Sequence, residues 1–509
     1  MTTDPHEPLL HAWRRNDWRF LTGALEPAHL GYIGNVSPEA LAALRLLQPD
    51  ARAVGSMGTA DDGAFDLVFS ASSSPLDIVR GFAALSENGA LCIEVGGALA
   101  AGASAAPLRQ TLRRAKRIPG AHALAYWSAP DLARTARLVP MHDAPALDAT
   151  LARHDGSSTL RALSIGARLA GRMHAHWVFA RQGYVVVTRS RTPHPIFGDE
   201  HPVIITPRFD TSRHVVALRE TESGSGSWVA KVPRQPGDDS GIGREGRMLE
   251  ALRVAAPELA ASVPRVERFT MIGSTTYLLR EAMHGAPLDP AAVARDHDLA
   301  VEIGLRFIDA MPRTRESSEN SNWFDTLVTA PLERLSALSG RASITRLVER
   351  THEALAGLRE RPMPAVFEHG DLGHPNVLLA PSGELRVLDW ERAREHGLPG
   401  HDLVFYLQYC AESARGAFTR EAQRRAFDEL WAVGGEGRRL LERQLGGHGL
   451  GFDAAFVLLA WTRSAATLAD RLEANADSAG MADQLIAADR DVMLWSHALD
   501  WLGGTDHSS

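Results

Sequence analysis

Cysteine and lysine are almost absent from this 509-residue chain. Cys92 and Cys410 are the only cysteines, too few for a disulfide framework or a thiolate metal site. Only Lys116 and Lys231 are lysines among 54 basic residues, so arginine supplies nearly all the positive charge. A lysine kept in such a background is a candidate phosphate ligand, because phosphate binding can require a compact ammonium on a flexible stem.

Long apolar runs are missing as well. No stretch of eighteen apolar residues occurs, and the N-terminus lacks the basic and then apolar pattern of an export signal. We therefore expect a cytoplasmic protein without a membrane partner. The net charge of -8 argues against a nucleic-acid partner, which would require a basic face.

The remaining composition is that of a globular protein, with 45% apolar and 23% charged residues. A chain of 509 residues exceeds one hydrophobic core, so two or three domains are expected.

The strongest pattern lies in residues 366–404. Asp371 follows a strand-like apolar run, where its carboxylate can accept the proton of an incoming hydroxyl. Asn376 stands five residues later and can offer an amide oxygen to magnesium. A second apolar run at 385–388 follows a β-hairpin whose turn is expected at Pro381-Ser382-Gly383. This run delivers Asp389 as a second magnesium ligand. This order of Asp, Asn and Asp is the catalytic-loop and metal-loop arrangement of kinases. The alternative is that all three are turn residues that cap strands.

The same stretch resembles the aminoglycoside phosphotransferase and choline kinase family of small-molecule kinases. Three motifs carry the resemblance: HGD at 369–371 with Asn376, LDWE at 388–391 and DLV at 402–404. The resemblance implies an α+β bilobal protein-kinase-like domain that uses ATP, with GTP as the alternative donor, and Mg²⁺. It also implies that His369 and Asp402 support the catalytic loop, Asp402 by capping a helix.

The implied reaction is transfer of the γ-phosphoryl group to a hydroxyl of a small molecule such as a sugar, an amino alcohol or an aminoglycoside-like compound. Two rival functions stay open. One is a bifunctional kinase and S-adenosylmethionine-dependent methyltransferase, and the other is a noncatalytic nucleotide-binding pseudokinase. A protein kinase is disfavoured, because HGD stands in place of HRD and no activation loop of suitable length follows Asp389.

Lys231 ends the strand-like run WVAKV and resembles the phosphate-binding lysine on the third strand of a kinase. A pattern of helical spacing begins about fourteen residues later, and its Glu245 is the expected ion-pair partner of Lys231, with Glu250 as the fallback. The alternatives are a solvated strand-end lysine and a surface glutamate.

Two further segments are expected to contact the nucleotide. Strands at 203–208 and 215–219 would form a lid over the phosphates, with Thr211 and Ser212 facing them. The segment 276–283 resembles the family's hinge, where Glu281 and Met283 would lie along the adenine edge.

The helices expected after residue 411 would build the acceptor site, as in the family. Asp470, Glu473 and Asp477 form an acidic group there, although a solvated helix face is the more ordinary interpretation. Glu391 could reach a second magnesium ion or a cationic group of the substrate.

The first 190 residues predict a different fold class from the kinase-like part. Strands such as 65–69 alternate with helices such as 38–47, which predicts an α/β, Rossmann-like, doubly wound domain. The order FDLVFS, LSENGALCIEVGG and YWSAPD resembles a methyltransferase that binds S-adenosylmethionine. The turn offers only Gly31 and Gly34, however, and no carboxylate ends the candidate second strand at 51–54.

We therefore expect a degenerate module that positions, regulates or dimerises the kinase, with methyl transfer as the alternative. The expected division is 1–190 for this module, 191–201 for a linker, 202–283 for the kinase small lobe and 284–509 for the large lobe. The sequence does not predict the oligomeric state.

Overall fold

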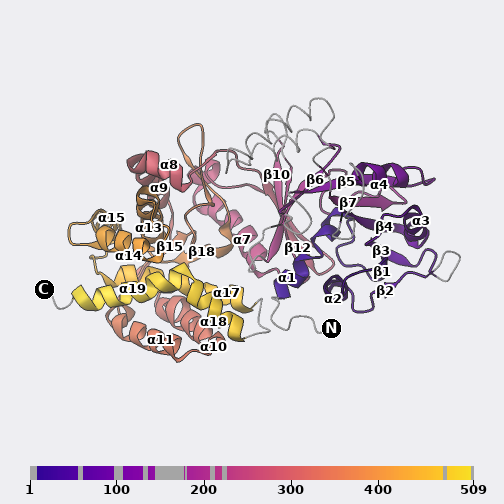
Figure 1. Ribbon diagram of the computed structural model, residues 1–509. Coiled ribbons are helices and arrows are strands. Elements are labelled where there is room, and N and C mark those ends of the chain that lie inside the picture. The colour runs from indigo at the N-terminus through magenta and orange to yellow at the C-terminus, as the bar shows by residue number, and fades with distance from the viewer. Residues whose placement is uncertain are drawn as a thin grey trace. The chain divides into compact units, whose positions relative to one another are not determined.

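The structure, a computed structural model, describes residues 9–55, 61–96, 107–129, 136–143, 177, 180, 182–206, 213–219, 226–473 and 479–505 (Figure 1). The chain forms two compact units. The first comprises Met1–Asp239 and Glu267–Ala282, and the second comprises Ser240–Val266 and Met283–Ser509.

One sheet runs through the described part of the first unit and has twelve strands in the order β11-β12-β10-β9-β8-β6-β5-β7-β4-β3-β1-β2. The strands are β1 (Leu30–Ile33), β2 (Arg52–Ala53), β3 (Phe65–Ser70), β4 (Leu85–Val95), β5 (His122–Ala129), β6 (Arg137–Pro140), β7 (Gly183–Thr188), β8 (Val203–Ile205), β9 (His214–Arg219), β10 (Trp228–Pro233), β11 (Val266–Ile272) and β12 (Thr275–Glu281).

The N-terminal end of this sheet is parallel. Strands β2, β1, β3 and β4 are neighbours in that order, and each pair is parallel. Helices α2 (Pro38–Leu47) and α3 (Pro75–Ala83) each begin with a serine N-cap and a proline at the first position, a strong helix start. Strand β7 then lies antiparallel between β4 and β5. The predicted alternation of strands and helices is present, while the Rossmann-like assignment stays a prediction.

Strand pairing continues across the segment that the sequence suggested as a linker. β6 pairs with β8 and β8 pairs with β9, both antiparallel, so strands from before and after 191–201 share one ladder. Within that segment His194 and Gly198 exchange backbone hydrogen bonds of 2.7 and 2.8 Å and close a tight turn. The compact units thus divide the chain differently from the expected borders, which remain a prediction about domains.

The N-terminal segment is tied to the last strands of the same unit. It contains α1 (Leu9–Arg14) and the 3₁₀ helix η1 (Asp17–Leu21). Asp17 forms an ion pair of 3.0 Å with Arg234 just after β10, and their side chains are 5% and 1% exposed. Glu26 accepts hydrogen bonds from the Ser274 amide at 3.1 Å and the Thr275 hydroxyl at 2.5 Å, at the turn between β11 and β12.

A continuous apolar core covers one face of the sheet across this junction. Leu67, Phe69 and Val186 of the N-terminal strands belong to the same buried cluster as Ala217 of β9 and Ala230 of β10. Trp18 and Phe20 of η1 pack into this cluster. Burial of this face therefore stabilises the small-lobe strands and the N-terminal strands together.

The described part of the second unit is mainly helical. Its helices are α7 (Ser240–Ala255), η3 (Pro257–Ala261), α8 (Pro290–Arg295), α9 (His297–Asp309), η4 (Ser317–Glu319), η5 (Asp325–Thr329), α10 (Ala330–Leu338), α11 (Ala342–Ala354), α12 (Ala356–Arg359), η6 (Trp390–Arg392), α13 (His401–Arg415), α14 (Arg420–Trp431), α15 (Glu436–Gly447), α16 (Ala455–Ala466), α17 (Leu468–Glu473), α18 (Ala479–Ala488) and α19 (Arg490–Thr505). Helix α16 is buried along its whole length and packs against α13 and α19.

Two small sheets position the loops of this unit. One has the order β13 (Ala286–Pro287), β16 (Val377–Leu379), β17 (Leu385–Val387), and the other has the order β14 (Arg313–Arg315), β15 (Ala365–Glu368), β18 (Arg394–Gly397). The hairpin predicted between Asn376 and Asp389 is formed by β16 and β17. Among the described helices, none has both the length and the apolar character needed to cross a bilayer.

Candidate active site

The catalytic loop begins where the fully buried strand β15 ends at Glu368. Gly370 has φ 80°, and a Cβ at this position would lie 2.8 Å from the Arg392 carbonyl oxygen. Only glycine fits this left-handed and crowded position without strain. The tight turn at Gly370 therefore fixes where Asp371 lies relative to the end of β15.

Asp402 and His369 hold this loop. The Asp402 carboxylate accepts hydrogen bonds from the backbone amides of His369 at 2.7 Å and Gly370 at 2.8 Å. Burial raises the pKa of Asp402 to about 6, against the lowering effect of these hydrogen bonds. The His369 ring contacts the Leu388 carbonyl at 2.8 Å through Nε2 and accepts the Asp371 amide at 3.2 Å through Nδ1. One buried histidine thus links the loop that carries Asp371 to the loop that carries Asp389.

Asn376 is buried and lies within the same network. Its side-chain nitrogen donates to the Asp371 carbonyl at 3.1 Å, and its own carbonyl accepts the Leu388 amide at 2.7 Å. Within the described residues its amide oxygen accepts no hydrogen bond. The amide is therefore oriented by its nitrogen and keeps its oxygen as a ligand atom.

Asp389 has an unusual backbone. It is the only residue other than glycine in the described ranges with positive φ (63°, with ψ 67°). Such a conformation costs roughly 1–3 kcal/mol and persists where the surrounding structure enforces it. The next residue, the fully buried Trp390, donates to the Val387 carbonyl at 3.1 Å and packs edge-on against His369 at 4.7 Å. The strain at Asp389 marks a position where the direction of a side chain matters.

The donor set of these two loops fits magnesium. Asn376 and Asp389 supply oxygen atoms, and their loops are joined by the hydrogen bond from Leu388 to Asn376. No group of three or more His, Cys, Asp or Glu residues suited to a metal occurs in the described part of the chain. Two protein ligands agree with magnesium chemistry, because this ion usually takes one or two protein ligands and completes its shell with water and phosphate oxygens.

Lys231 lies in the interior of the first unit's sheet. It is 4% exposed and is paired with Val216 of β9 and Leu278 of β12. Glu245 lies on α7 of the second unit and is fully buried. The two residues belong to different units, so their ion pair stays a prediction.

The predicted hinge coincides with the border between the units. Glu281 ends β12 and is exposed, Ala282 donates to the Ser227 carbonyl at 3.1 Å, and the second unit resumes at Met283. The adenine contacts of Glu281 and Met283 stay predictions. Thr211 and Ser212 lie outside the described residues.

The acidic group expected near the acceptor is ion-paired. Asp470 contacts Arg334 at 2.6 Å and Arg244 at 3.6 Å, and Glu473 also pairs with Arg334. Asp477 lies outside the described residues. The Glu391 carbonyl accepts a hydrogen bond from Arg244 at 3.1 Å.

Sequence reasoning missed a buried ion pair beneath the loop. Glu368 is bound by Arg463 of α16, with one contact of 2.9 Å, and also accepts the Leu398 amide at 3.0 Å. Burial raises the pKa of Glu368, but Arg463, His401 and neighbouring charges outweigh it and lower the pKa to about 2. The available signal was an arginine inside the apolar stretch AFVLLAWTRSAA.

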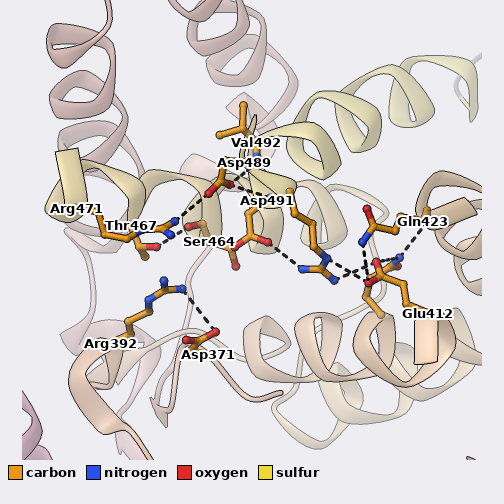
Figure 2. Close-up of polar contacts among 12 residues, drawn as sticks. Asp371, Arg392, Glu412, Gln423, Ser464, Thr467, Arg471, Asp489, Asp491 and Val492 are labelled. Atoms are coloured by element: carbon orange, nitrogen blue, oxygen red, sulfur yellow. Dashed lines mark hydrogen bonds and ion pairs between the residues drawn. The ribbon is translucent and has the colours of Figure 1, made fainter. Parts of the chain in front are cut away.

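Arg392 was missed as well. Its guanidinium Nη1 lies 3.6 Å from Oδ1 of Asp371, and the two side chains are 19% and 30% exposed (Figure 2). Burial lowers the pKa of Arg392, but the surrounding carboxylates, first Asp371 and then Asp491, raise it above its usual range. The available signal was an arginine directly after the LDWE motif.

Comparison with known proteins assigns this site to a class. Residues 207–442 match the model of the phosphotransferase enzyme family, APH, and this range contains all of the predicted site residues. This part of the chain is therefore similar to that family. No curated protein matches the chain in sequence.

Several solved structures are similar to the C-terminal part. A thermostable mutant of the aminoglycoside phosphotransferase APH(4)-Ia has 14% identity and a TM-score of 0.39, and the match covers 58% of this chain and 93% of that one. The choline kinase LicA from Streptococcus pneumoniae has 13% identity and a TM-score of 0.34, with 58% and 91% covered. An aminoglycoside phosphotransferase from Alicyclobacillus acidocaldarius has 17% identity and a TM-score of 0.31, with 58% and 91% covered. Since all three TM-scores are below 0.5, the assignment rests on the family match.

Proposed function

We propose that this chain is a magnesium-dependent phosphotransferase that moves the γ-phosphoryl group of ATP to a hydroxyl of a small molecule. One observation carries the proposal. The buried His369 contacts the Asp371 amide and the carbonyl of Leu388, which precedes Asp389, and Asn376 bonds to the backbone of Asp371 and Leu388. The family match over residues 207–442 supports the same reaction. GTP is the alternative donor.

In this reaction Asp371 orients the acceptor hydroxyl and accepts its proton. The acceptor oxygen bonds to the γ-phosphorus while the bond from that phosphorus to the leaving oxygen of ADP breaks. Asn376 and Asp389 would hold magnesium, which neutralises charge on the phosphates when bound. Lys231, paired with Glu245, would contact the nucleotide phosphates. Most of the rate enhancement then comes from positioning and charge neutralisation.

For the N-terminal part we propose an architectural role as a degenerate Rossmann-like module. Asp61, the nearest acidic residue after β2, accepts the Gly55 amide at 2.6 Å and pairs with Arg52 at 2.9 Å. A Cβ on Gly31 would lie 2.8 Å from the Val54 side chain, so packing between strands accounts for that glycine. These contacts give Gly31 and Asp61 packing and ion-pair roles in place of S-adenosylmethionine binding, and they support a scaffold for the predicted small-lobe strands.

The test is a phosphorylation screen of the purified full chain against sugars, sugar acids, amino alcohols and aminoglycosides, with ATP or GTP and magnesium. We expect ADP and a phosphorylated product in equal amounts. Asp371→Asn should lower the turnover by about 10²–10⁴-fold, the usual contribution of a positioned general base. Its thermal unfolding should match that of the native chain. Nucleotide binding without turnover of any compound would instead identify a pseudokinase.

A further inference from the structure

The carboxylates on the helices expected to hold the acceptor are neutralised by arginines. Asp489 at the start of α19 pairs with Arg471 at 2.9 Å, and Arg490 binds both Asp491 at 2.9 Å and Glu412 of α13 at 3.0 Å (Figure 2). Asp470 and Glu473 are likewise paired with an arginine, Arg334. These five carboxylates, any of which could recognise a cationic acceptor, are thus already engaged by arginines.

The Arg392 side chain, by contrast, makes no hydrogen bond to the described residues. Within the described residues the only polar contact of its side chain is the ion pair with Asp371, and 3.6 Å is too long for a hydrogen bond. Its guanidinium has five N–H donors, and in the described part of the chain none of them donates to a protein acceptor. The side chain is still 19% exposed, so these donors can be reached from solvent.

We propose that Arg392 binds an anionic group of the acceptor, a carboxylate or a phosphate monoester, next to the hydroxyl that Asp371 activates. This inference rests on the phosphotransferase function proposed above and specifies its substrate class. It favours acidic acceptors over the amino alcohols and aminoglycoside-like compounds that the sequence suggested.

The position of Arg392 places this role on the acceptor side of the site. The carboxylates that act on its guanidinium are, in decreasing order, Asp371, Asp491 of α19, Glu391 and Asp389. Figure 2 shows Arg392 and Asp371 below the start of α19, where Asp489 and Asp491 lie. Asp389, which would hold magnesium, is thus the weakest of these four neighbours.

The chemistry of the Arg392 guanidinium and of an anionic acceptor group also supports binding between them. The planar guanidinium can form two parallel hydrogen bonds with a carboxylate or a phosphate, which fixes the orientation of the bound group. An anionic acceptor beside the Asp371 carboxylate would otherwise be repelled, and Arg392 offsets that repulsion. A cationic acceptor would be repelled by the guanidinium, which disfavours it.

The experiment compares matched pairs of acceptors with the full chain, ATP and magnesium. Suitable pairs are glucose with glucuronate, glycerol with glycerate, and glycerol with glycerol 3-phosphate. We expect kcat/KM to be about ten- to hundredfold higher for the acidic member of a pair, the range of a charged hydrogen bond. The carboxylate and phosphate arms identify which anion the site prefers, and a preference for either supports the proposal.

Arg392→Gln should remove this preference, mainly by raising KM for the acidic acceptor, and should leave KM for ATP unchanged. Arg392→Lys should restore part of it, because the charge is kept and the planar fork is lost. Arg334→Gln is the matched control, since the donors of Arg334 are already used by Asp470 and Glu473.

Three results would overturn the proposal. The first is a higher kcat/KM for neutral acceptors in the native chain. The second is a preference for acidic acceptors that survives in Arg392→Gln. The third is an equal fall in kcat/KM for acidic and neutral acceptors in Arg392→Gln, together with a raised KM for ATP. If no pair is turned over but a neutral or cationic compound of the wider screen is, the acidic-acceptor proposal fails and the phosphotransferase function stands. If no compound of the screen is turned over, the phosphotransferase function itself is contradicted. Thermal shifts with glucuronate and inorganic phosphate in the presence of MgADP then test Arg392 separately, and equal shifts in native and Arg392→Gln protein would also reject the anion site.

Discussion

The catalytic loop of the second unit and the sheet of the first unit depend on contacts of very different sequence separation. Asp402 binds His369 across 33 positions, and the loops that present Asp371, Asn376 and Asp389 lie within that span. The first unit instead joins Asp17 to Arg234 across 217 positions and Glu26 to Ser274 across 248. The site is therefore a local motif, whereas the sheet that carries Lys231 is assembled from both ends of the unit.

The largest change in stability is expected at the Asp17–Arg234 ion pair, which joins the N-terminal segment of the first unit to the end of β10. Asp17→Asn should lower the unfolding free energy of the chain by about 3–5 kcal/mol, because the buried Arg234 would lose its ion pair with Asp17. The measurement is the midpoint of thermal or urea unfolding of the full chain. If the N-terminal segment were only an appendage, the midpoint would stay at the native value.

Two variants serve as controls for this prediction. Asp62→Asn removes an exposed carboxylate of the same unit and should change stability by less than about 0.5 kcal/mol. The double variant Asp17→Leu with Arg234→Met removes both charges and should recover much of the loss.

The next largest effect is expected beneath the catalytic loop, at Glu368. Its pKa falls from 4.5 in the unfolded chain to about 2 in the fold, so its ionised form stabilises the fold. This contribution is fully present above pH 4.5 and is lost as the pH falls toward 2. A difference of this size corresponds to about 3 kcal/mol.

Glu368→Gln should therefore lower the unfolding midpoint most at neutral pH, and the gap from the native chain should narrow between pH 4.5 and 2. The comparison of native and variant curves isolates this residue from other titrating groups. A gap that is independent of pH would show that the charge of Glu368 does not stabilise the loop.

The smallest effect is expected where ion pairs are exposed. Arg334 is 44% exposed in its contacts with Asp470 and Glu473. Arg334→Ala should change the unfolding free energy by at most about 1 kcal/mol, because solvent screens such pairs. Added salt should reduce even this difference, and a loss as large as that of Asp17→Asn would reverse the ranking.

The catalytic loop could be predicted because its chemistry requires particular residues at short spacing. The motifs contain His369, Asp371, Asn376, Asp389 and Asp402, and hydrogen bonds in the structure link the loops that carry them. The strand of Lys231 and the helix of Glu245 were also predicted from their apolar patterns. The pairing of the two side chains stays a prediction, because Lys231 and Glu245 belong to different compact units.

Other features had no local signal. The ladder between β6 and β8 depends on strand edges that the sequence does not distinguish, and Arg463 reaches Glu368 across 95 positions. Arg392 is three residues from Asp389, but its importance lies in the absence of hydrogen bonds within the described residues, which only the structure reveals. Local motifs specify reacting groups, while long-range packing decides what surrounds them.

The most direct test of the phosphotransferase site is the formation of ADP from ATP by the full chain, with an accepted acceptor, across a magnesium titration. We predict turnover that requires magnesium in the native chain and is lost in Asp389→Ala, while the unfolding midpoint of the variant stays close to native. Magnesium-dependent turnover that continues unchanged in Asp389→Ala would contradict the assignment of this site.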